Sequence, residues 1–378
     1  MKKRATLMSG ALATMFLLSP TAQSASTGDR LENLEASLEL AEEANAELRS
    51  ELDNRMKISG YVDVEYVVTD KKDKGFRMHH LSLFFQKKLS DKWRFFSEIE
   101  YEDAPKFDNE RGDTVVVDTD GGTGSTSVYD FGDANGKIFV EAVNLDYLWK
   151  PEAIFRVGRF FTPAGIWSVD HYPPFVATQE RPKHIRKIFP QLVDGAMVYG
   201  TVAAGKHYIK YDAFVGNGDG NNGHNDANSQ RALGLKTSVI VSVPMFSHLE
   251  IGGTFYTDPK DTKNNDSKKT AIGGHAKFST GDISFQSEAA YAQFEEPKSP
   301  TIKGYYGQLM YAPNQWGVGG RHDFYDDGAG TKERIANSVF VNYQALTNLV
   351  LKIEHHMISQ DGNDDSTKTI FSVVSYLE

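Results

Sequence analysis

Beyond residue 56, apolar and polar side chains alternate with a period of two in one short segment after another. Because successive side chains of a β-strand point to opposite faces, this period predicts strands with one apolar and one polar face. We count sixteen such segments, at 56–67, 76–89, 93–102, 138–149, 153–161, 193–202, 206–216, 231–243, 248–257, 269–279, 282–294, 302–311, 315–325, 334–344, 348–358 and 368–377.

The connections between these segments alternate between two kinds. Tight connections fall at Ser90-Asp91, Lys150-Pro151-Glu152 and Thr280-Gly281, among others, and long polar connections lie between them. An even number of strands, with short turns at one end and long loops at the other, is typical of outer-membrane barrels. We therefore predict an all-β fold, a 16-stranded antiparallel transmembrane β-barrel over 56–378.

The faces of the predicted strands favour the same fold. In 348–358, Leu351 and Ile353 alternate with Lys352 and Glu354. Apolar side chains outside and polar ones inside are the arrangement of a barrel in lipid, and sixteen strands leave room for an aqueous channel. The alternation also explains a mean hydropathy of only -0.45.

The N-terminus has the pattern of an export signal. Lys2, Lys3 and Arg4 precede a short apolar core over 12–18, and small residues follow from 22 to 26. This is the order of a cleavable signal peptide, and the core is too short for a membrane anchor. We predict a signal peptide over 1–25, with an uncleaved N-terminal helix as the alternative, and a location in the cell outer membrane.

A heptad repeat follows over 29–55, where apolar residues are spaced alternately three and four apart. This spacing predicts a short coiled-coil helix, and the polar residue at one a position is of the kind that fixes register and oligomer order. A trimer below the barrel fits the geometry, the heptads alone leave a dimer open, and a helix folded back on the barrel is the alternative. The seam consists of Leu31, Leu34, Leu38, Ala41, Asn45, Leu48 and Leu52.

Composition excludes several other functions. The chain has no cysteine, so it holds no disulfide, Cys-ligated metal or thiol nucleophile. Its 51 acidic residues against 41 basic ones argue against nucleic-acid binding. The pairs His79-His80 and His355-His356 lack a metal-ligand spacing, and no Gly-x-Ser-x-Gly or phosphate-loop motif is present. We therefore predict no metal site in the barrel, no cofactor and no catalytic residues. An outer-membrane hydrolase and a structural or adhesive barrel remain the alternatives.

One long connection, 162–192, carries a basic excess, whereas 102–137 holds nine acidic and three basic residues. Cations on a loop inside the pore would act most strongly on permeating ions, because charges at a narrow point are poorly screened. A solvated surface loop is the alternative. The candidate residues of the constriction are Arg181, Lys183, His184, Arg186 and Lys187, with Arg156 and Arg159 just before the loop.

The arginines before the loop have an alternative explanation. Arg156 and Arg159 are also consistent with an interior ion pair to Asp146 or with a position at the rim. Other bases expected to face the lumen include Arg94, Lys210 and Arg321, and they are nearly matched by lumen carboxylates. The predicted ion selectivity is therefore mild.

The stretch from Phe155 to Trp167, FRVGRFFTPAGIW, resembles the Gly-Arg-Phe…Pro-x-Gly signature of the phosphate-selective porin O and P superfamily. With the signal peptide, heptads and strand count, the chain resembles the DcaP-like branch, which has an N-terminal periplasmic coiled coil. The resemblance implies a trimeric, 16-stranded channel whose third long loop folds inward and narrows the pore.

The expected function is that of an outer-membrane porin, a water-filled channel for passive diffusion of small hydrophilic solutes. We expect a mild preference for anions such as phosphate or dicarboxylates, because guanidinium groups offer paired donors to oxyanions. The expected partners are two further copies of the chain, outer-membrane lipid and lipopolysaccharide. The acidic outer loops, including Asp361, Asp364 and Asp365, are expected to bind divalent cations or bridge lipopolysaccharide.

Overall fold

The computed structural model describes residues 55–70, 74–103, 115–119, 122–126, 137–218, 230–261, 267–296, 301–328 and 333–377. The expected signal peptide and all but the last residue of the expected coiled coil lie outside these ranges. The barrel belongs to a unit that spans Met56–Glu378.

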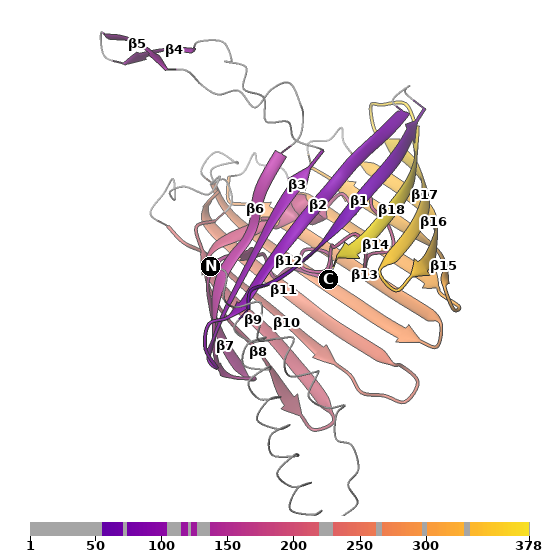
Figure 1. Ribbon diagram of the computed structural model, residues 1–378, viewed down its shortest axis with the longest axis horizontal. Helices are drawn as coiled ribbons and strands as arrows, with labels where there is room; N and C mark the ends of the chain where they lie inside the picture. Colours follow the sequence, from indigo (N-terminus) through magenta and orange to yellow (C-terminus); the bar gives the residue numbers. More distant parts are fainter. Residues whose placement is uncertain are drawn as a thin grey trace, which may run out of the picture. The chain divides into compact units, whose positions relative to one another are not determined.

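Sixteen antiparallel strands close into one barrel (Figure 1). β3 pairs with β6 across a long connection, and β1 pairs with β18, so that no strand edge is left open. The predicted count and antiparallel order of the strands are confirmed. The barrel strands are β1 (Lys57–Thr69), β2 (Lys74–Lys88), β3 (Trp93–Glu102), β6 (Lys137–Lys150), β7 (Ala153–Phe161), β8 (Leu192–Ala204), β9 (His207–Gly216), β10 (Ala232–Ile240), β11 (His248–Asp261), β12 (Ser267–Thr280), β13 (Ile283–Phe294), β14 (Ile302–Tyr311), β15 (Trp316–Asp326), β16 (Arg334–Leu346), β17 (Leu349–Gln360) and β18 (Ser366–Leu377).

Most strand ends lie within a few residues of the predicted ones. The largest shortening is at β10, predicted to reach residue 243, which ends at Ile240 because Pro244 lies in the turn that follows. A separate two-stranded sheet, β4 (Val115–Thr119) with β5 (Gly122–Thr126), was not predicted. It lies within the acidic connection 102–137, whose low apolar content masked the β-branched run of β4.

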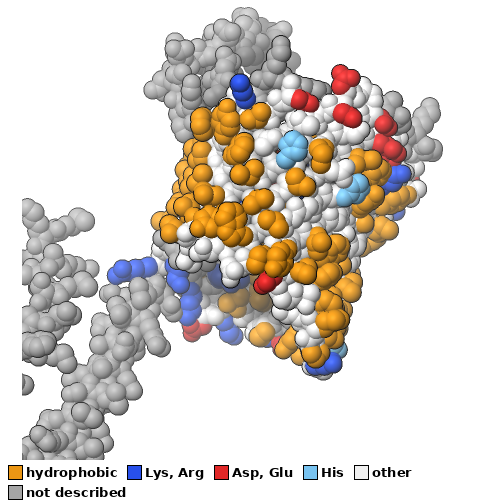
Figure 2. All heavy atoms as spheres, turned by 90° about the vertical axis from the view of Figure 1, so that its right-hand side faces the viewer, with side chains coloured by type: hydrophobic (Ala, Val, Ile, Leu, Met, Phe, Trp, Pro, Cys, Tyr) orange, Lys and Arg blue, Asp and Glu red, His pale blue; other side chains and the backbone are white. Residues whose placement is uncertain are grey.

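Exposure alternates along the strands as the sequence predicted. In β17, Leu351 and Ile353 are 40% and 49% exposed, whereas Lys352 and Glu354 between them are 3% and 1% exposed. Figure 2 shows hydrophobic side chains spread over one outer face of the barrel wall. The wall is therefore apolar outside, and its inner face carries many polar side chains together with an apolar cluster that includes Phe160, Met197 and Phe214.

The connection between β7 and β8, residues 162–191, enters the barrel. It contains a single helical turn, α2 (Ile185–Ile188), and Ile188 is fully buried among inward residues of the wall such as Phe160 and Tyr256. No helix among the described residues is long and apolar enough to cross a membrane.

Two β-bulges change which side chains face inward on one part of the wall. Asp63 pairs with His80 and Val64 with Met78, so His79 is an extra residue in β2. On β6 the register shifts in the same way, and Glu141 is the extra residue. A bulge interrupts the alternation of faces, which allows two consecutive side chains to point to the same side.

Candidate pore constriction

The backbone of the inward loop is held by carboxylates of the barrel wall. The N–H of Trp167 donates to Glu288 on β13, at 2.9 Å, and the N–H of Gln179 donates to Glu354 on β17, at 3.0 Å. Buried backbone N–H groups need a hydrogen-bond acceptor, and these side-chain oxygens supply it. Two widely separated strands thus fix the path of the loop across the barrel interior.

Basic side chains of the wall also hold the loop, and here the wall donates the hydrogen bonds. Lys352 donates to the carbonyl oxygen of Val176 at 2.6 Å, and Arg321 donates to the Thr178 hydroxyl at 2.5 Å. Arg321 is only 4% exposed and lies 5.9 Å from the centre of the Trp167 ring. Arg321, expected to line the lumen, therefore points inward but is covered by the loop.

The glycine of the Pro163-Ala164-Gly165 motif stands where the loop turns into the barrel. Gly165 has a φ of +56°, and a Cβ atom added there would lie 1.6 Å from an oxygen of Glu288. Its N–H donates to Thr254 at 3.2 Å, and its carbonyl oxygen accepts from Lys236. This explains the glycine of the motif, because glycine, which has no Cβ atom, combines this conformation with so close an approach to the wall.

The loop cations line a cavity of about 270 Å³ between the loop and the wall. Lys183, Arg186 and Lys187 are exposed there, and Arg181 is half-buried. Of the five loop residues expected in the constriction, the structure brings these four together around one cavity. The wall side of the cavity is formed by residues such as Glu65, Arg77, His79, His80 and Glu102.

The fifth residue, His184, has a different environment. It is 2% exposed, its ring lies 6.0 Å from that of Tyr306, and burial together with the charge of Arg321 lowers its pKa to about 4. A neutral, buried His184 packs the loop onto the wall and contributes no charge to the cavity at neutral pH. This differs from the expected role in the constriction.

Arg181 keeps its charge although it is partly enclosed. Burial and the neighbouring Arg186 lower the pKa of Arg181 to about 10, against the opposing effect of Glu141 and Glu100. Glu98, Glu100 and Glu141 are at most 3% exposed, and one carboxylate oxygen of each lies within 4.8 Å of the others. Cations of the loop thus face carboxylates of the β3–β6 wall. Glu141 was missed, because the bulge that turns it inward has no signal in the sequence.

The residues that line a second cavity, of about 520 Å³, include Arg94 on β3 and Arg156 on β7. Both guanidinium groups bind Asp146, at 2.6 Å and 2.7 Å, and Tyr199 also donates to Asp146, at 2.9 Å. The interior ion pair considered for Arg156 is therefore present. Lys210, also expected in the lumen, lines the same cavity and lies 3.6 Å from Glu250.

Arg159 does not lie in the constriction. It pairs across the strands with Val143 and Asp194, and Val143 is 40% exposed on the outer face of the wall. The Arg159 guanidinium forms an ion pair with Asp194, at 2.7 Å. The expectation that Arg159 lines the pore is corrected, because it lies three positions after the inward-facing Arg156 and therefore on the opposite face of β7.

The acidic outer loops are only partly described. Most of 102–137 lies outside the described residues, and the same holds for most of the connection before β10. Asp361, Asp364 and Asp365 are exposed in the connection between β17 and β18.

Comparisons of the sequence give only a partial match. No family model matches the chain. An uncharacterised protein of Aquifex aeolicus (strain VF5) is 27% identical over 165 residues, which are 43% of this chain and 32% of that protein, so the match spans about a third of the relative's length.

Solved structures of outer-membrane proteins resemble the barrel over most of its length. The loop L8 deletion form of OmpT from Vibrio cholerae has a TM-score of 0.57 at 12% identity, covering 85% of this chain and 99% of OmpT. In-vitro folded OmpT, described as a trimer form, has a TM-score of 0.54 at 11% identity, with coverages of 85% and 99%. The outer membrane channel DcaP of Acinetobacter baumannii has a TM-score of 0.52 at 12% identity, with coverages of 85% and 96%. The chain thus has the 16-stranded fold of porin-like barrels.

Proposed function

We propose that the protein is an outer-membrane porin, a water-filled channel through which small hydrophilic solutes diffuse passively. The observation that carries the proposal is the inward loop 162–191, which is tied to β13 and β17 and leaves cavities of about 520 Å³ and 270 Å³ that are lined by many charged residues. Porins keep a polar interior of this kind as an aqueous path. The apolar outer wall supports a position in a lipid bilayer.

We further propose a mild preference for anions, with phosphate or dicarboxylates as candidate solutes. The smaller cavity is lined by six basic and three acidic residues, and the larger one by five basic and three acidic residues. Exposed outer-loop acids oppose this preference, but their field fades within about 8 Å at physiological ionic strength. The charges between loop and wall are screened less and decide the sign.

Reconstitution in a planar bilayer tests both proposals. The wild type should form open channels, and its zero-current potential in a salt gradient should have the sign of anion preference. Replacing four cations of the loop by glutamine should shift that potential toward cation preference, because these side chains supply most of the basic excess of the smaller cavity. The loop variant combines Arg181→Gln, Lys183→Gln, Arg186→Gln and Lys187→Gln.

A matched control neutralises four exposed bases near the short turns. It should leave the zero-current potential near that of the wild type, because wide, solvated rims screen charge. A cation-selective wild type, or an equal shift in both variants, would contradict the assignment of the loop as the selectivity filter. The control combines Lys57→Gln, Lys92→Gln, Lys150→Gln and Lys206→Gln, all exposed in the structure.

The finer expectations about assembly are proposals as well. A homotrimer is supported by the fold shared with OmpT, one form of which is described as a trimer. The export signal over 1–25 and the heptads over 29–55 support an outer-membrane protein with a periplasmic coiled coil. Contacts with lipopolysaccharide through the acidic outer loops belong to the same proposal. A hydrolase or an adhesive barrel would give no large open-channel conductance, so the bilayer measurement also separates these alternatives.

A further inference from the structure

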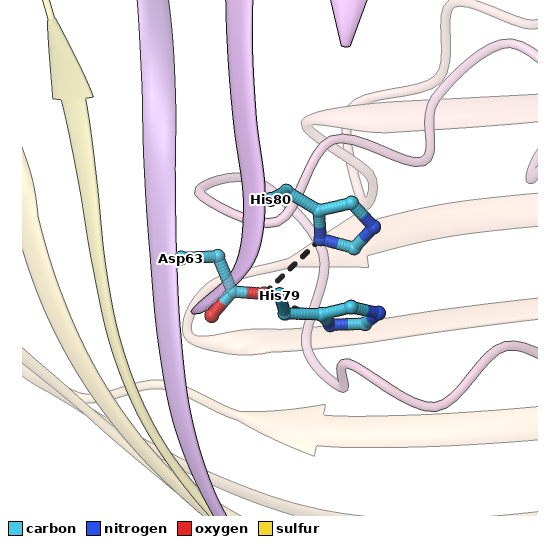
Figure 3. A group of neighbouring side chains, drawn as sticks. All are labelled: Asp63, His79 and His80. Carbon is cyan, nitrogen blue, oxygen red and sulfur yellow. Dashed lines mark hydrogen bonds and ion pairs between the residues drawn. The ribbon is translucent and has the colours of Figure 1, made fainter. Parts of the chain in front are cut away.

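Two adjacent histidines of β2 point to the same side of the wall. In a regular strand, His79 and His80 would face opposite sides, but the bulge at this position makes His79 the extra residue. Figure 3 shows both rings beside Asp63, which extends from the neighbouring strand β1. The bulge therefore assembles two imidazoles and one carboxylate from residues that the regular alternation would separate.

The distances from Asp63 to the two imidazoles match those between ligands of one metal ion, and the three ligand atoms all lie within 4.8 Å of one another. The Nδ1 atoms of His79 and His80 both lie 3.3 Å from the same oxygen, Oδ2 of Asp63. Two ligands of a tetrahedral ion with bonds of about 2.0–2.1 Å are about 3.4 Å apart. One oxygen facing two imidazole nitrogens at this separation thus outlines the positions of three ligands.

The surroundings supply a fourth donor and a route of entry. Glu65 is 1% exposed, and its Oε1 lies 2.9 Å from His79 Nδ1. Its other oxygen, Oε2, has no hydrogen-bond partner among the described residues and lies 3.6 Å from Arg77. Glu65, His79 and His80 all line the 270 Å³ cavity, so an ion in the cavity can reach them.

A carboxylate also lies near the second ring nitrogen of His80. Nε2 of His80, the ring nitrogen that does not face Asp63, lies 3.6 Å from Oε1 of Glu102. Metal-binding histidines commonly direct their second ring nitrogen toward a carboxylate, which orients the ring and makes the first nitrogen a better ligand. The position of Glu102 fits this arrangement.

The second pair of adjacent histidines lacks these features. His355 and His356 lie in an unbulged part of β17, so their side chains point to opposite faces of the wall. His356 contacts Ser338 at 2.6 Å and Glu354 at 3.2 Å, whereas His355 contacts Thr369 at 2.9 Å. Two adjacent histidines are therefore not sufficient for a metal site, and the pair His355-His356 serves as an internal control.

We propose that Asp63, His79 and His80, with Glu65 beside them, bind a divalent first-row transition metal ion such as Zn²⁺ on the inner wall of the barrel. Imidazole nitrogens combined with carboxylate oxygens suit zinc and its neighbours better than calcium or magnesium, which prefer oxygen alone. The pair His79-His80 has no metal-ligand spacing in the sequence, because the proposed ligand set depends on the bulge and on Asp63 of another strand.

Nearby charges act on such an ion in both directions. Arg77 and the loop cations around the cavity repel it. Asp63, Glu65 and Glu102 attract it at shorter range, because their carboxylates contact the two imidazoles directly. Bound Zn²⁺ would add two positive charges beside the loop, so zinc should strengthen anion preference. That consequence depends on the proposed porin function, whereas binding itself does not.

Zinc binding is tested by competition with a chromophoric chelator, using the full chain folded in detergent, without a histidine tag and stripped of metal. The wild type should bind one Zn²⁺ per chain at micromolar concentration. His79→Gln with His80→Gln should weaken binding about tenfold or more, the loss that even the removal of an outer-shell partner can cause. His355→Gln with His356→Gln should bind like the wild type.

A single isosteric variant guards against a folding defect in the double variant. Asp63→Asn keeps the shape of the side chain and both histidines, and it should weaken zinc binding while the gel mobility of the folded barrel stays unchanged. No binding by the wild type at micromolar zinc, or equal losses in the two histidine double variants, would overturn the proposal. Because the measurement needs no conductance, it remains decisive even if the protein is not a porin.

Discussion

At the residue scale, one carboxylate organises the wall of the larger cavity. Asp146 is 1% exposed and accepts from Arg94, Arg156 and Tyr199 at 2.6–2.9 Å. Each arginine is thereby held against the wall with its charge partly compensated. The field in this cavity depends on the pairing of its charges as well as on their number.

Replacing Asp146 by asparagine should leave two guanidinium groups without a counter-charge. We expect the zero-current potential of Asp146→Asn to move toward anion preference and the free energy of unfolding to fall by about 2 kcal/mol or less, because hydrogen bonds to charged groups contribute about 1.5–3 kcal/mol and Arg94 is 46% exposed. Asp91→Asn, at a turn where the side chain is 94% exposed, is the control. A shift toward cations in Asp146→Asn would contradict this view of the cavity.

The contact between Glu180 and Lys368 should make the loop sensitive to acid. Burial alone raises the pKa of Glu180, but Lys368, at 2.6 Å, lowers it to about 2 from an ordinary value of 4.5. A depressed pKa means that the stabilisation is complete above about pH 4.5 and is lost as the pH falls toward 2. Hydrogen exchange of residues 176–183 should therefore accelerate between these values. In Glu180→Gln this acid step should be absent, and an unchanged step would assign it to another group.

At the element scale, the inward loop is held mainly by charged side chains of distant strands. Lys352 and Glu354, two residues apart on β17, respectively donate to and accept from the loop backbone. Buried charges of this kind are costly unless they are fully paired. Removing the loop would leave these wall groups unpaired, so the contacts that hold the loop also stabilise the wall.

Replacing Lys352 by methionine should loosen the loop while the barrel stays closed. The variant keeps an unbranched side chain of similar length but loses both hydrogen bonds to loop carbonyls, those of Val176 and Pro173. We expect noisier single-channel currents with an altered mean conductance, and unchanged β-content by circular dichroism. Lys303→Met, which removes an ion pair of β14 with Asp326, is the control. Equally quiet channels in both variants would show that Lys352 does not hold the loop.

The sequence predicted the strands far better than the site, for a physical reason. Alternation repeats in every strand, so errors at single residues do not change the count, and the strand count and order are confirmed. The inner surface depends on local exceptions. The bulges at His79 and Glu141 turn extra side chains inward, and neither leaves a pattern in the sequence. The outward position of Arg159, in contrast, could have been predicted by counting three residues on from Arg156, although Arg159 was expected in the constriction.

The environment of the basic loop residues could likewise be predicted only in part from the sequence. Arg181, Lys183, Arg186 and Lys187 were recognisable as a basic cluster, and they do gather around one cavity. His184 looked like a member of the set, but its burial against Tyr306 depends on how the loop packs. Composition identifies which titratable side chains a segment carries, whereas packing decides which of them are exposed to solvent.

At the scale of the whole molecule, the closed barrel places both of its ends on one side. β1 begins and β18 ends at the end of the barrel that carries the short turns, since the two strands pair antiparallel and Gly60 lies opposite Leu377. The chain therefore enters the barrel from the side that faces the periplasm in the proposed orientation.

Deleting residues 30–55 tests whether the heptad segment helps to assemble the protein. An isolated helix of this length is marginal in water, so the segment should fold only by associating, and its apolar seam should add to the contacts between barrels. We expect the deletion variant, expressed with an intact signal peptide, to retain its barrel but to dissociate at lower temperature on detergent gels. Asn45→Leu is the informative companion, because an apolar residue at this a position should strengthen the oligomer while relaxing its order. A deletion variant that dissociates at the wild-type temperature would show that the barrel walls alone hold the oligomer together.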